Sequence, residues 1–326
     1  MFFANACTFG EVEAMRNSVG NEMKMMPYFG VVVGLLTFLL NAGALLAMLL
    51  PKVARKQRMF LLIRLICFTY CIFGVGLLIS GSFALYRLYG SGLRLVTQAG
   101  CFFQFLLLDF SLRLLTDVSL FTGLDRCLAV VAPKFYVHVF KRKLTTTIML
   151  LIILHCSIME IVGYFHTSDQ MLLLCSYVTI FERSYFIKSQ MQINLLLAIT
   201  LVVYLFLMLW IRLKMRTVER HGDNISQSRR QRMNVKLIVT LFMCVGTFCI
   251  TTVVGNVVIS FALSISDLTQ SILTTRYALL AFFDGILHFI LLYCRMGEFR
   301  KLIHYPLLRQ SAATKCSIGM ISSKGI

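Results

Sequence analysis

Charged side chains recur every four residues in one apolar stretch of the sequence. Asp109, Arg113 and Asp117 all lie between residues 100 and 124. Side chains four residues apart share one face of a helix, so these groups can pair with one another or contact a polar molecule. Ions in an apolar environment are costly without a partner or a function. Two hypotheses follow: Asp109 and Arg113 contact a ligand, or the three charges form a ladder of ion pairs that packs against Glu160. For Asp117 the ladder is favoured.

A second polar pair, Asp284 and His288, stands one helical turn apart in the last apolar segment. The cost of ions in such surroundings predicts that both side chains point into the protein. They could relay a signal along a helix or make a structural contact with Asn41, and the structural contact is favoured. The same reasoning interprets His155 and Glu160 as structural residues.

Signatures of catalysis or metal binding are missing. The sequence contains no P-loop, no dinucleotide-binding glycine turn, no His-Glu-x-x-His and no Gly-x-Ser-x-Gly motif. Cys67 and Cys71 stand four residues apart, but no histidine or second cysteine pair accompanies them, so no metal site is expected there. The chain is therefore not expected to be an enzyme or to need a cofactor.

The composition identifies the surroundings of these charges. Of 326 residues, 58% are apolar and only 14% are charged, whereas soluble domains contain about half and about a quarter. A soluble fold could not cover this much apolar surface with polar side chains, and disorder requires low hydrophobicity. The chain is therefore expected to be a membrane protein.

Seven apolar segments are each long enough to cross a ~30 Å hydrocarbon core as a helix. Transmembrane strands would alternate in polarity, and these segments do not. Helices also satisfy their backbone groups internally. The expected fold class is an all-α membrane protein, a bundle of seven transmembrane helices. The segments are residues 28–50, 59–85, 100–124, 144–165, 190–211, 237–263 and 274–293.

Basic residues predict the orientation of the bundle. The segments after helices 1, 3, 5 and 7 hold 23 Lys and Arg, and the opposite side holds 7. The positive-inside rule then puts residues 1–27 outside, the bundle 28–294 in the membrane and residues 295–326 in the cytoplasm. The net charge of +18 faces anionic inner-leaflet lipid, and nucleic acid is excluded as a partner.

Without a preceding signal peptide, the first helix is expected to act as a signal anchor. The acceptor Asn224 lies in a basic loop and is expected to stay unglycosylated.

A short motif ends the third helix. Asp125-Arg126-Cys127 precedes Pro133, and Arg126 stands 25 residues after Cys101. A helix of that length rises about 37 Å, so Cys101 and Arg126 lie at opposite membrane faces. The motif and its spacing resemble those of rhodopsin-like G-protein-coupled receptors. An arginine that merely snorkels at a helix end is the alternative, and the spacing favours the receptor motif.

Further positions are similar to the same family. Asn41 matches the helix 1 asparagine, and Tyr293 with Phe299 matches the end of helix 7 and the start of a short cytoplasmic helix 8. The resemblance implies that Arg126 pairs with its neighbour Asp125 at rest and meets a G protein after activation. The residues assigned to coupling are Asp125, Arg126, Cys127, Pro133 and Tyr293.

The resemblance also implies a disulfide and a ligand pocket. Cys101 would pair with Cys175, the cysteine between helices 4 and 5. Asp109 lies eight residues beyond Cys101, about 12 Å into the membrane, which is the depth at which these receptors bind ligands. The candidate pocket residues are Asp109, Arg113 and Asp284.

Departures from the usual pattern refine the family. Cys67, Thr69 and Tyr70 occupy the part of helix 2 where many relatives carry an acidic residue, and helices 6 and 7 lack the Trp-x-Pro and Asn-Pro motifs. This pattern resembles the divergent nematode serpentine chemoreceptors. Arg64 and the loop around Tyr136 are similar to the class called beta-c.

The sequence is therefore interpreted as a chemosensory receptor of the plasma membrane, including that of sensory cilia. It would bind an external small molecule and activate a heterotrimeric G protein from the cytoplasmic face. The alternative is a seven-helix ligand-gated channel or transporter, with an ion pathway lined by the intramembrane charges. Transporters usually have internal repeats and helices broken by Pro or Gly, whereas this chain has 4 Pro and no repeat. Cys294 and Cys316 are candidate acylation sites near the inner leaflet.

Overall fold

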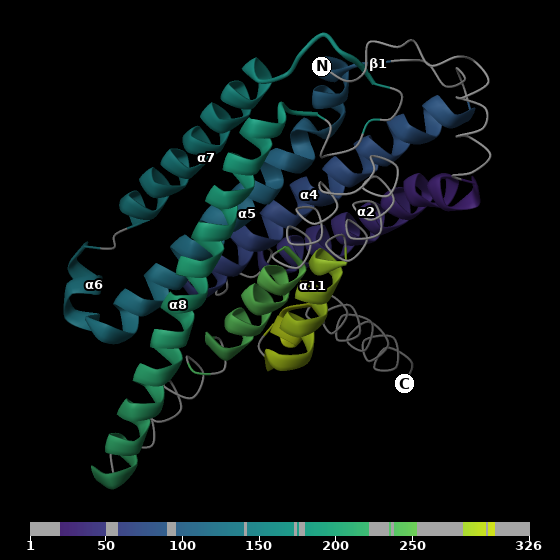
Figure 1. Cartoon of the computed structure of the whole chain (residues 1–326). Helices are drawn as coiled ribbons and strands as arrows, with labels where there is room; N and C mark the ends of the chain where they lie inside the picture. The colour runs from purple at the N-terminus through teal and green to yellow at the C-terminus, as the bar shows by residue number, and fades with distance from the viewer. Residues whose placement is uncertain are drawn as a thin grey trace, which may run out of the picture.

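The computed structural model describes residues 20–49, 58–89, 96–139, 142–172, 175, 180–221, 235, 238–252, 283–297 and 299–303. These residues are mainly helical (Figure 1). The labelled helices are α2 (Gly20–Leu49), α4 (Arg58–Tyr89), α5 (Gln98–Val131), α6 (Pro133–Val139), α7 (Arg142–Phe165), α8 (Arg183–His221) and α11 (Asp284–Arg295). A further apolar helix runs over Ile238–Thr252.

Five helices are long and apolar enough to cross a membrane, and they coincide with the first five predicted segments. Their spans are Pro27–Leu49, Phe60–Arg87, Gln98–Val131, Leu144–Phe165 and Arg183–Leu213. The prediction of an all-α membrane protein is therefore confirmed. The sixth predicted segment is described only over Ile238–Thr252, and the seventh only over α11. Residues 253–282, Asn224 and Cys316 lie outside the described residues.

The structure differs from the sequence-based expectation at several points. The helices α2 and α8 begin at Gly20 and Arg183, before the predicted starts at 28 and 190. The helix α8 extends ten residues past the predicted end at 211, because Arg, Lys, Met and Glu, which favour helices, follow the apolar segment. The loop after α5 forms the short helix α6, which begins at Pro133, a residue suited to a first helical turn. Two short strands outside the membrane-spanning segments, β1 (Val96–Thr97) and β2 (Met171–Leu172), pair in antiparallel register.

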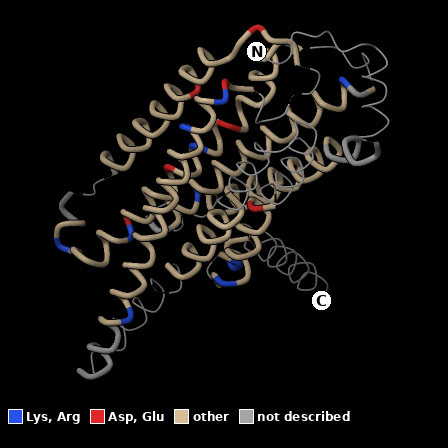
Figure 2. Tube along the Cα trace, viewed as in Figure 1, with Lys and Arg blue, Asp and Glu red and all other residues tan. Residues whose placement is uncertain are grey.

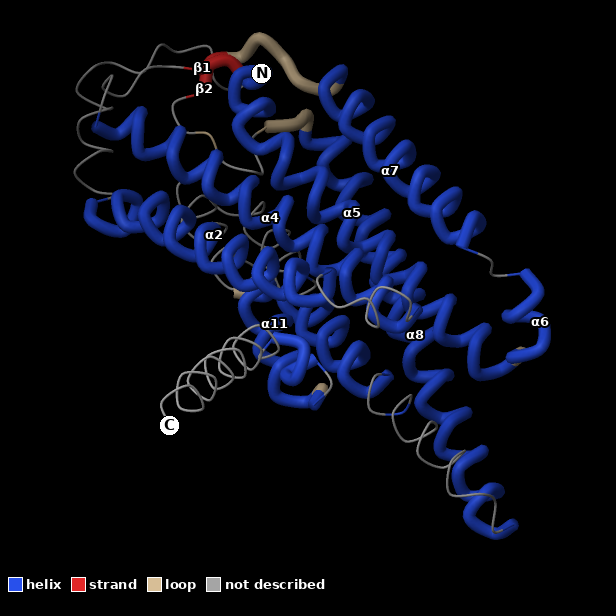
Figure 3. The backbone as a smooth tube through the Cα atoms, turned by 180° about the vertical axis from the view of Figure 1, so that it is seen from behind, coloured by secondary structure: helices blue, strands red, loops and turns tan. Residues whose placement is uncertain are grey.

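The helix α5 lies at the centre of the described bundle. It packs against α4 on one side and against α7 and α8 on the other, and α6 folds back onto its end. Figure 3 shows α2, α4 and α5 running together, with α7 and α8 beyond them. The apolar core includes Leu77, Val118, Leu197 and Tyr204. Many large apolar side chains of α7 and α8 point outward, as expected where a helix faces lipid.

Glycines allow α2 and α4 to approach backbone to backbone. A methyl group at Gly74 would lie 2.8 Å from the carbonyl oxygen of Gly34, and one at Gly34 would lie 2.8 Å from that of Gly74. Gly76 likewise leaves no room for a side chain, because the backbone nitrogen of Leu108 on α5 would lie 2.9 Å away. Such close contacts between small residues are the main way in which helices associate within lipid.

Candidate functional site

The end of α5 carries a closed triad of polar side chains. Arg126 donates from Nη2 to Asp125 Oδ2 at 2.5 Å and from Nε to the same oxygen at 3.0 Å. The Tyr136 hydroxyl on α6 donates to the Asp125 carboxylate, at 3.0 Å from Oδ1 and 3.1 Å from Oδ2. Arg126 Nη2 lies 3.4 Å from the Tyr136 oxygen. Asp125 is fully buried and Arg126 nearly so. The guanidinium group is therefore held by its neighbour and by α6.

The other residues predicted for coupling surround this triad or belong to α11. Cys127 is a half-buried free thiol, and Pro133 begins the helix that carries Tyr136. Tyr293 stacks on Phe289 at a centroid distance of 6.1 Å, and Phe289 meets the fully buried Phe299 edge-on at 6.1 Å. These rings tie α11 to the helical residues 299–303, where helix 8 was expected.

Arg113 stands at the centre of a buried cluster that joins α5, α7 and α8. It donates from Nε and Nη2 to Asp109 Oδ2 at 3.0 and 2.9 Å, and from Nε to Glu160 Oε1 at 3.1 Å. Nη2 also donates to Ser189 Oγ at 2.7 Å. The exposed fractions are 2% for Asp109, 4% for Arg113 and 6% for Glu160. These are the contacts that the ladder hypothesis expects, with Ser189 as an additional partner. We call these four residues the Arg113 cluster. Figure 2 marks the positions of the charged residues along the helices of the bundle.

Asp117 does not continue the ladder. Its Oδ2 lies 2.8 Å from His155 Nδ1 and 3.6 Å from Cys156 Sγ, both on α7. Eight residues of helix turn about 80° beyond two full turns, so Asp117 faces other partners than Asp109 does. Among the described residues this trio is the group whose side chains could hold a metal ion. The hydrogen bonds between them account for the arrangement without one.

Asp284 lies in a separate polar group between α2, α4 and α11. The Tyr70 hydroxyl donates to Asp284 Oδ2 at 2.5 Å, and the Tyr70 ring lies 4.8 Å from that of His288. Asn41 donates to the carbonyl oxygen of Gly285 at 3.2 Å, so its contact with this part of α11 is made to the backbone beside Asp284. The structure therefore brings Asp109 and Arg113 together and places Asp284 in a different group.

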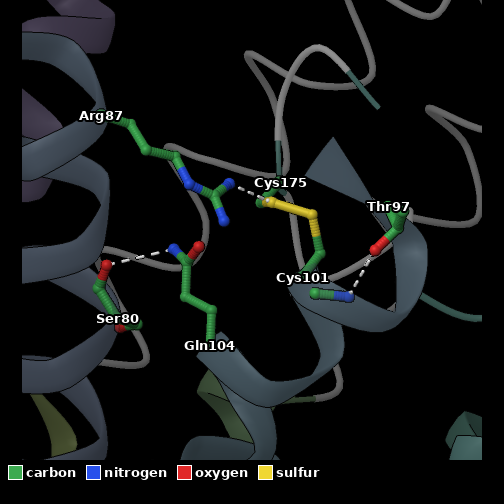
Figure 4. The surroundings of a disulfide bond; sticks show 7 residues. Ser80, Arg87, Thr97, Cys101, Gln104 and Cys175 are labelled. Carbon is green, nitrogen blue, oxygen red and sulfur yellow. Dashed lines mark hydrogen bonds between the residues drawn. A yellow bond between two sulfur atoms is a disulfide. The ribbon is translucent and has the colours of Figure 1, made fainter. Parts of the chain in front are cut away.

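A disulfide fixes the opposite end of α5. It joins Cys101 and Cys175, which are 74 positions apart, as the resemblance implies. Arg87 Nη1 donates to Cys175 Sγ at 2.6 Å, and Gln104 Nε2 donates to the carbonyl oxygen of Ser80 at 3.1 Å (Figure 4). The loop that follows α7 is thus tied to both α4 and α5. We call this the disulfide end of the bundle, and the opposite one the Arg126 end.

Together these features define a class of protein. Helices that can cross a membrane several times, a disulfide at one end of α5 and a closed Asp125–Arg126 pair at the other are the features of an all-α, multi-pass membrane receptor. The family model described as serpentine type 7TM GPCR chemoreceptor Srsx matches residues 39–306. The chain therefore belongs to this family of seven-transmembrane chemoreceptors, which is not a family of enzymes.

This match bears on the finer resemblances as well. The expectation of a nematode-type serpentine chemoreceptor is confirmed. The model that matches is Srsx, and it gives no support to class beta-c, which stays a prediction. A search of curated proteins found no match to this chain.

Sequence reasoning missed three residues that complete these groups. In the sequence, Tyr136 and Tyr70 were identified only as parts of the family pattern. Nothing there indicated that each would donate a hydrogen bond to a carboxylate. Most buried tyrosine hydroxyls find a hydrogen-bond partner, so a Tyr70 packed between helices is expected to meet an acceptor, but the rule does not single out Asp284. Ser189 lies one residue before the predicted fifth segment, and no pattern in the sequence indicated that it meets Arg113.

Proposed function

We propose that this chemoreceptor binds a small molecule at the disulfide end and activates a heterotrimeric G protein at the Arg126 end. The observation that carries the proposal is the triad of Asp125, Arg126 and Tyr136. A buried, paired arginine has to leave its partners before it can contact another protein. The triad thus has the properties of the closed state in an equilibrium that a ligand can shift.

The orientation follows from redox chemistry and charge. Disulfides form on the oxidising side of a membrane, so the disulfide end faces outward. Exposed basic residues at the other end, such as Lys134 and Arg212, fit the cytoplasmic face and its anionic lipid. We assign residues 1–27 to an extracellular tail, 28–294 to the bundle and 295–326 to helix 8 and a cytoplasmic tail. The membrane would be the plasma membrane, including that of sensory cilia.

The proposed ligand site includes Asp109 and Arg113. Both lie on α5, and Arg126 lies 17 residues beyond Asp109 on the same helix, a distance of about 25 Å. A ligand that changes the contacts of the Arg113 cluster would shift α5 against α7 and α8, and the triad sits at the far end of that helix. Asp284 would contribute through its bond to Tyr70, which links α11 to α4.

Nucleotide exchange on a purified G protein tests this proposal. The full-length receptor in lipid nanodiscs should accelerate exchange, and Arg126→Ala should abolish this acceleration. In cells, the same variant should reach the surface as the wild type does. Arg183→Ala, which removes an exposed arginine at the disulfide end, is the matched control and should leave exchange unchanged. Normal exchange by Arg126→Ala would contradict the proposal. A ligand-dependent ionic current in a bilayer, without exchange, would favour the channel alternative.

A further inference from the structure

We propose that Asp117, His155 and Cys156 form a binding site for one zinc ion, which links α5 to α7 within the membrane-spanning part of the bundle. We call these three residues the Asp117 trio. Asp117 lies on α5, and His155 and Cys156 are neighbours on α7. No motif in the sequence indicates this site, because Asp117 and His155 are 38 positions apart and belong to different helices.

The ligand atoms of the Asp117 trio lie close enough to share one ion. Asp117 Oδ2 lies 2.8 Å from His155 Nδ1 and 3.6 Å from Cys156 Sγ, and all three atoms lie within 4.8 Å of one another. Zinc binds oxygen and nitrogen at about 2.0–2.2 Å and sulfur at about 2.3 Å, so two ligands of one tetrahedral ion are about 3–4 Å apart and side-chain movements of about 1 Å suffice here. The hydrogen bonds that hold the trio together therefore also preorganise it for a metal.

The donor atoms and their charges favour zinc. Thiolate, imidazole and carboxylate groups are the usual ligands of Zn²⁺, and a fourth position can hold water. Ca²⁺ and Mg²⁺ instead require about six or more oxygen ligands. The Cys156 thiolate and the Asp117 carboxylate carry two negative charges and a neutral imidazole carries none, so the complex with a divalent ion is neutral. A neutral complex suits these apolar surroundings, where an unbalanced charge is costly.

Gln192 on α8 can stabilise the metal-bound form of His155. Its Nε2 lies 3.4 Å from His155 Nε2, the ring nitrogen that does not contact Asp117. Zinc binding at Nδ1 moves the imidazole proton to Nε2, and the thiol of Cys156 releases its proton to solvent. The proton on Nε2 then needs an acceptor, and the Gln192 amide supplies its oxygen after a rotation that exchanges oxygen and nitrogen. Histidines that bind metals almost always have such a partner.

The burial of the Asp117 trio determines when the ion enters. Cys156 is fully buried, whereas the His155 side chain is 43% exposed and that of Asp117 is 12% exposed. The ion therefore has to bind before α7 has packed against α5, and metal binding commonly accompanies folding. Once bound, it would oppose the movement of α5 against α7 and so lower exchange. This consequence, unlike the site itself, rests on the proposed function.

Synthesis of the full-length receptor in a cell-free system, directly into nanodiscs, tests the site. Co²⁺ is the probe, because a cobalt–thiolate bond gives a charge-transfer band in the near ultraviolet and tetrahedral cobalt absorbs strongly in the visible range. We expect receptor synthesised with Co²⁺ to show both absorptions, and excess Zn²⁺ during synthesis to suppress them. Absence of the thiolate band, or a band that excess Zn²⁺ leaves unchanged, would overturn the inference.

Variants then locate the site. Cys156→Ser should abolish the thiolate band, whereas Cys249→Ser, which removes another buried free thiol, should keep it. Gln192→Leu should raise the Co²⁺ concentration needed for half-saturation during synthesis about tenfold or more, the loss expected for the partner of a metal-binding histidine. A band in Cys156→Ser equal to that of the wild type, or an equal loss in Cys249→Ser, would overturn the inference. If Cys156→Ser does not fold, the wild type and Gln192→Leu still decide.

The absorption measurements need neither a ligand nor a G protein, so they separate this inference from the proposed function. Cobalt bands without nucleotide exchange would support the site and contradict only the proposed coupling. Exchange without cobalt bands would overturn only the site. Basal exchange should also be lower in receptor synthesised with Zn²⁺ than in receptor synthesised with a chelator, and equal rates would overturn the consequence for signalling.

Discussion

Tyr136 should restrain basal signalling, and removal of its hydroxyl group tests the triad directly. In Tyr136→Phe the Asp125 carboxylate loses a donor at 3.0 Å, while Arg126 keeps its bonds to the same carboxylate. A hydrogen bond to a charged group contributes about 1.5–3 kcal/mol when buried. Tyr136 is only half-buried, so about 1 kcal/mol is the reasonable figure for this bond.

That free energy sets the expected change in activity. At about 1.4 kcal/mol per factor of ten, 1 kcal/mol shifts an equilibrium about fivefold. If the triad holds the closed state, ligand-independent nucleotide exchange should therefore rise about fivefold in Tyr136→Phe. Exchange is measured with equal concentrations of purified wild-type and variant receptor. The control is Tyr86→Phe, which changes an exposed tyrosine of α4.

Two results would refute this reasoning. Unchanged basal exchange would mean that the bond from Tyr136 to Asp125 persists in both states or is unrelated to activation. A fall in basal exchange would mean that Tyr136 itself contacts the G protein, so that its hydroxyl group stabilises the open state.

Two further predictions concern stability. Cys175→Ser removes the disulfide, which joins positions 74 residues apart, and should lower the free energy of unfolding by about 2–5 kcal/mol. A melting temperature equal to that of the wild type would contradict this. Gly74→Val should prevent the native approach of α2 to α4, because even a methyl group would lie 2.8 Å from a carbonyl oxygen. We expect loss of surface expression, measured by flow cytometry, and Gly43→Val, where nothing lies within 4 Å of an added methyl group, should express normally.

The helices were predictable because length and apolarity suffice to identify a membrane span. The pairing of Cys101 with Cys175 was predictable from a family resemblance. The ion pair of Asp109 and Arg113 followed from their four-residue spacing, since helix geometry alone brings them together. In each case the information lies within one helix or one motif.

Contacts between helices were much harder to predict. The rotation of α7 against α5 decides that Glu160 meets Arg113 while His155 meets Asp117, and no local pattern specifies that rotation. The bond from Tyr70 to Asp284 joins residues 214 positions apart. It depends on how closely α11 approaches α2 and α4, which Gly285 permits because a methyl group there would lie 2.5 Å from Thr37.

The mutual contact of Gly34 and Gly74 bears on how the chain is made. α2 and α4 follow one another in the sequence and pack extensively together, so they can associate as a hairpin as soon as both have left the ribosome. Contacts between neighbouring segments form early because they close short loops. The hairpin would then present Gly76 as a ready surface for α5. Substitutions at these glycines should therefore act during biosynthesis and send the nascent receptor to quality control before any ligand or G protein is met.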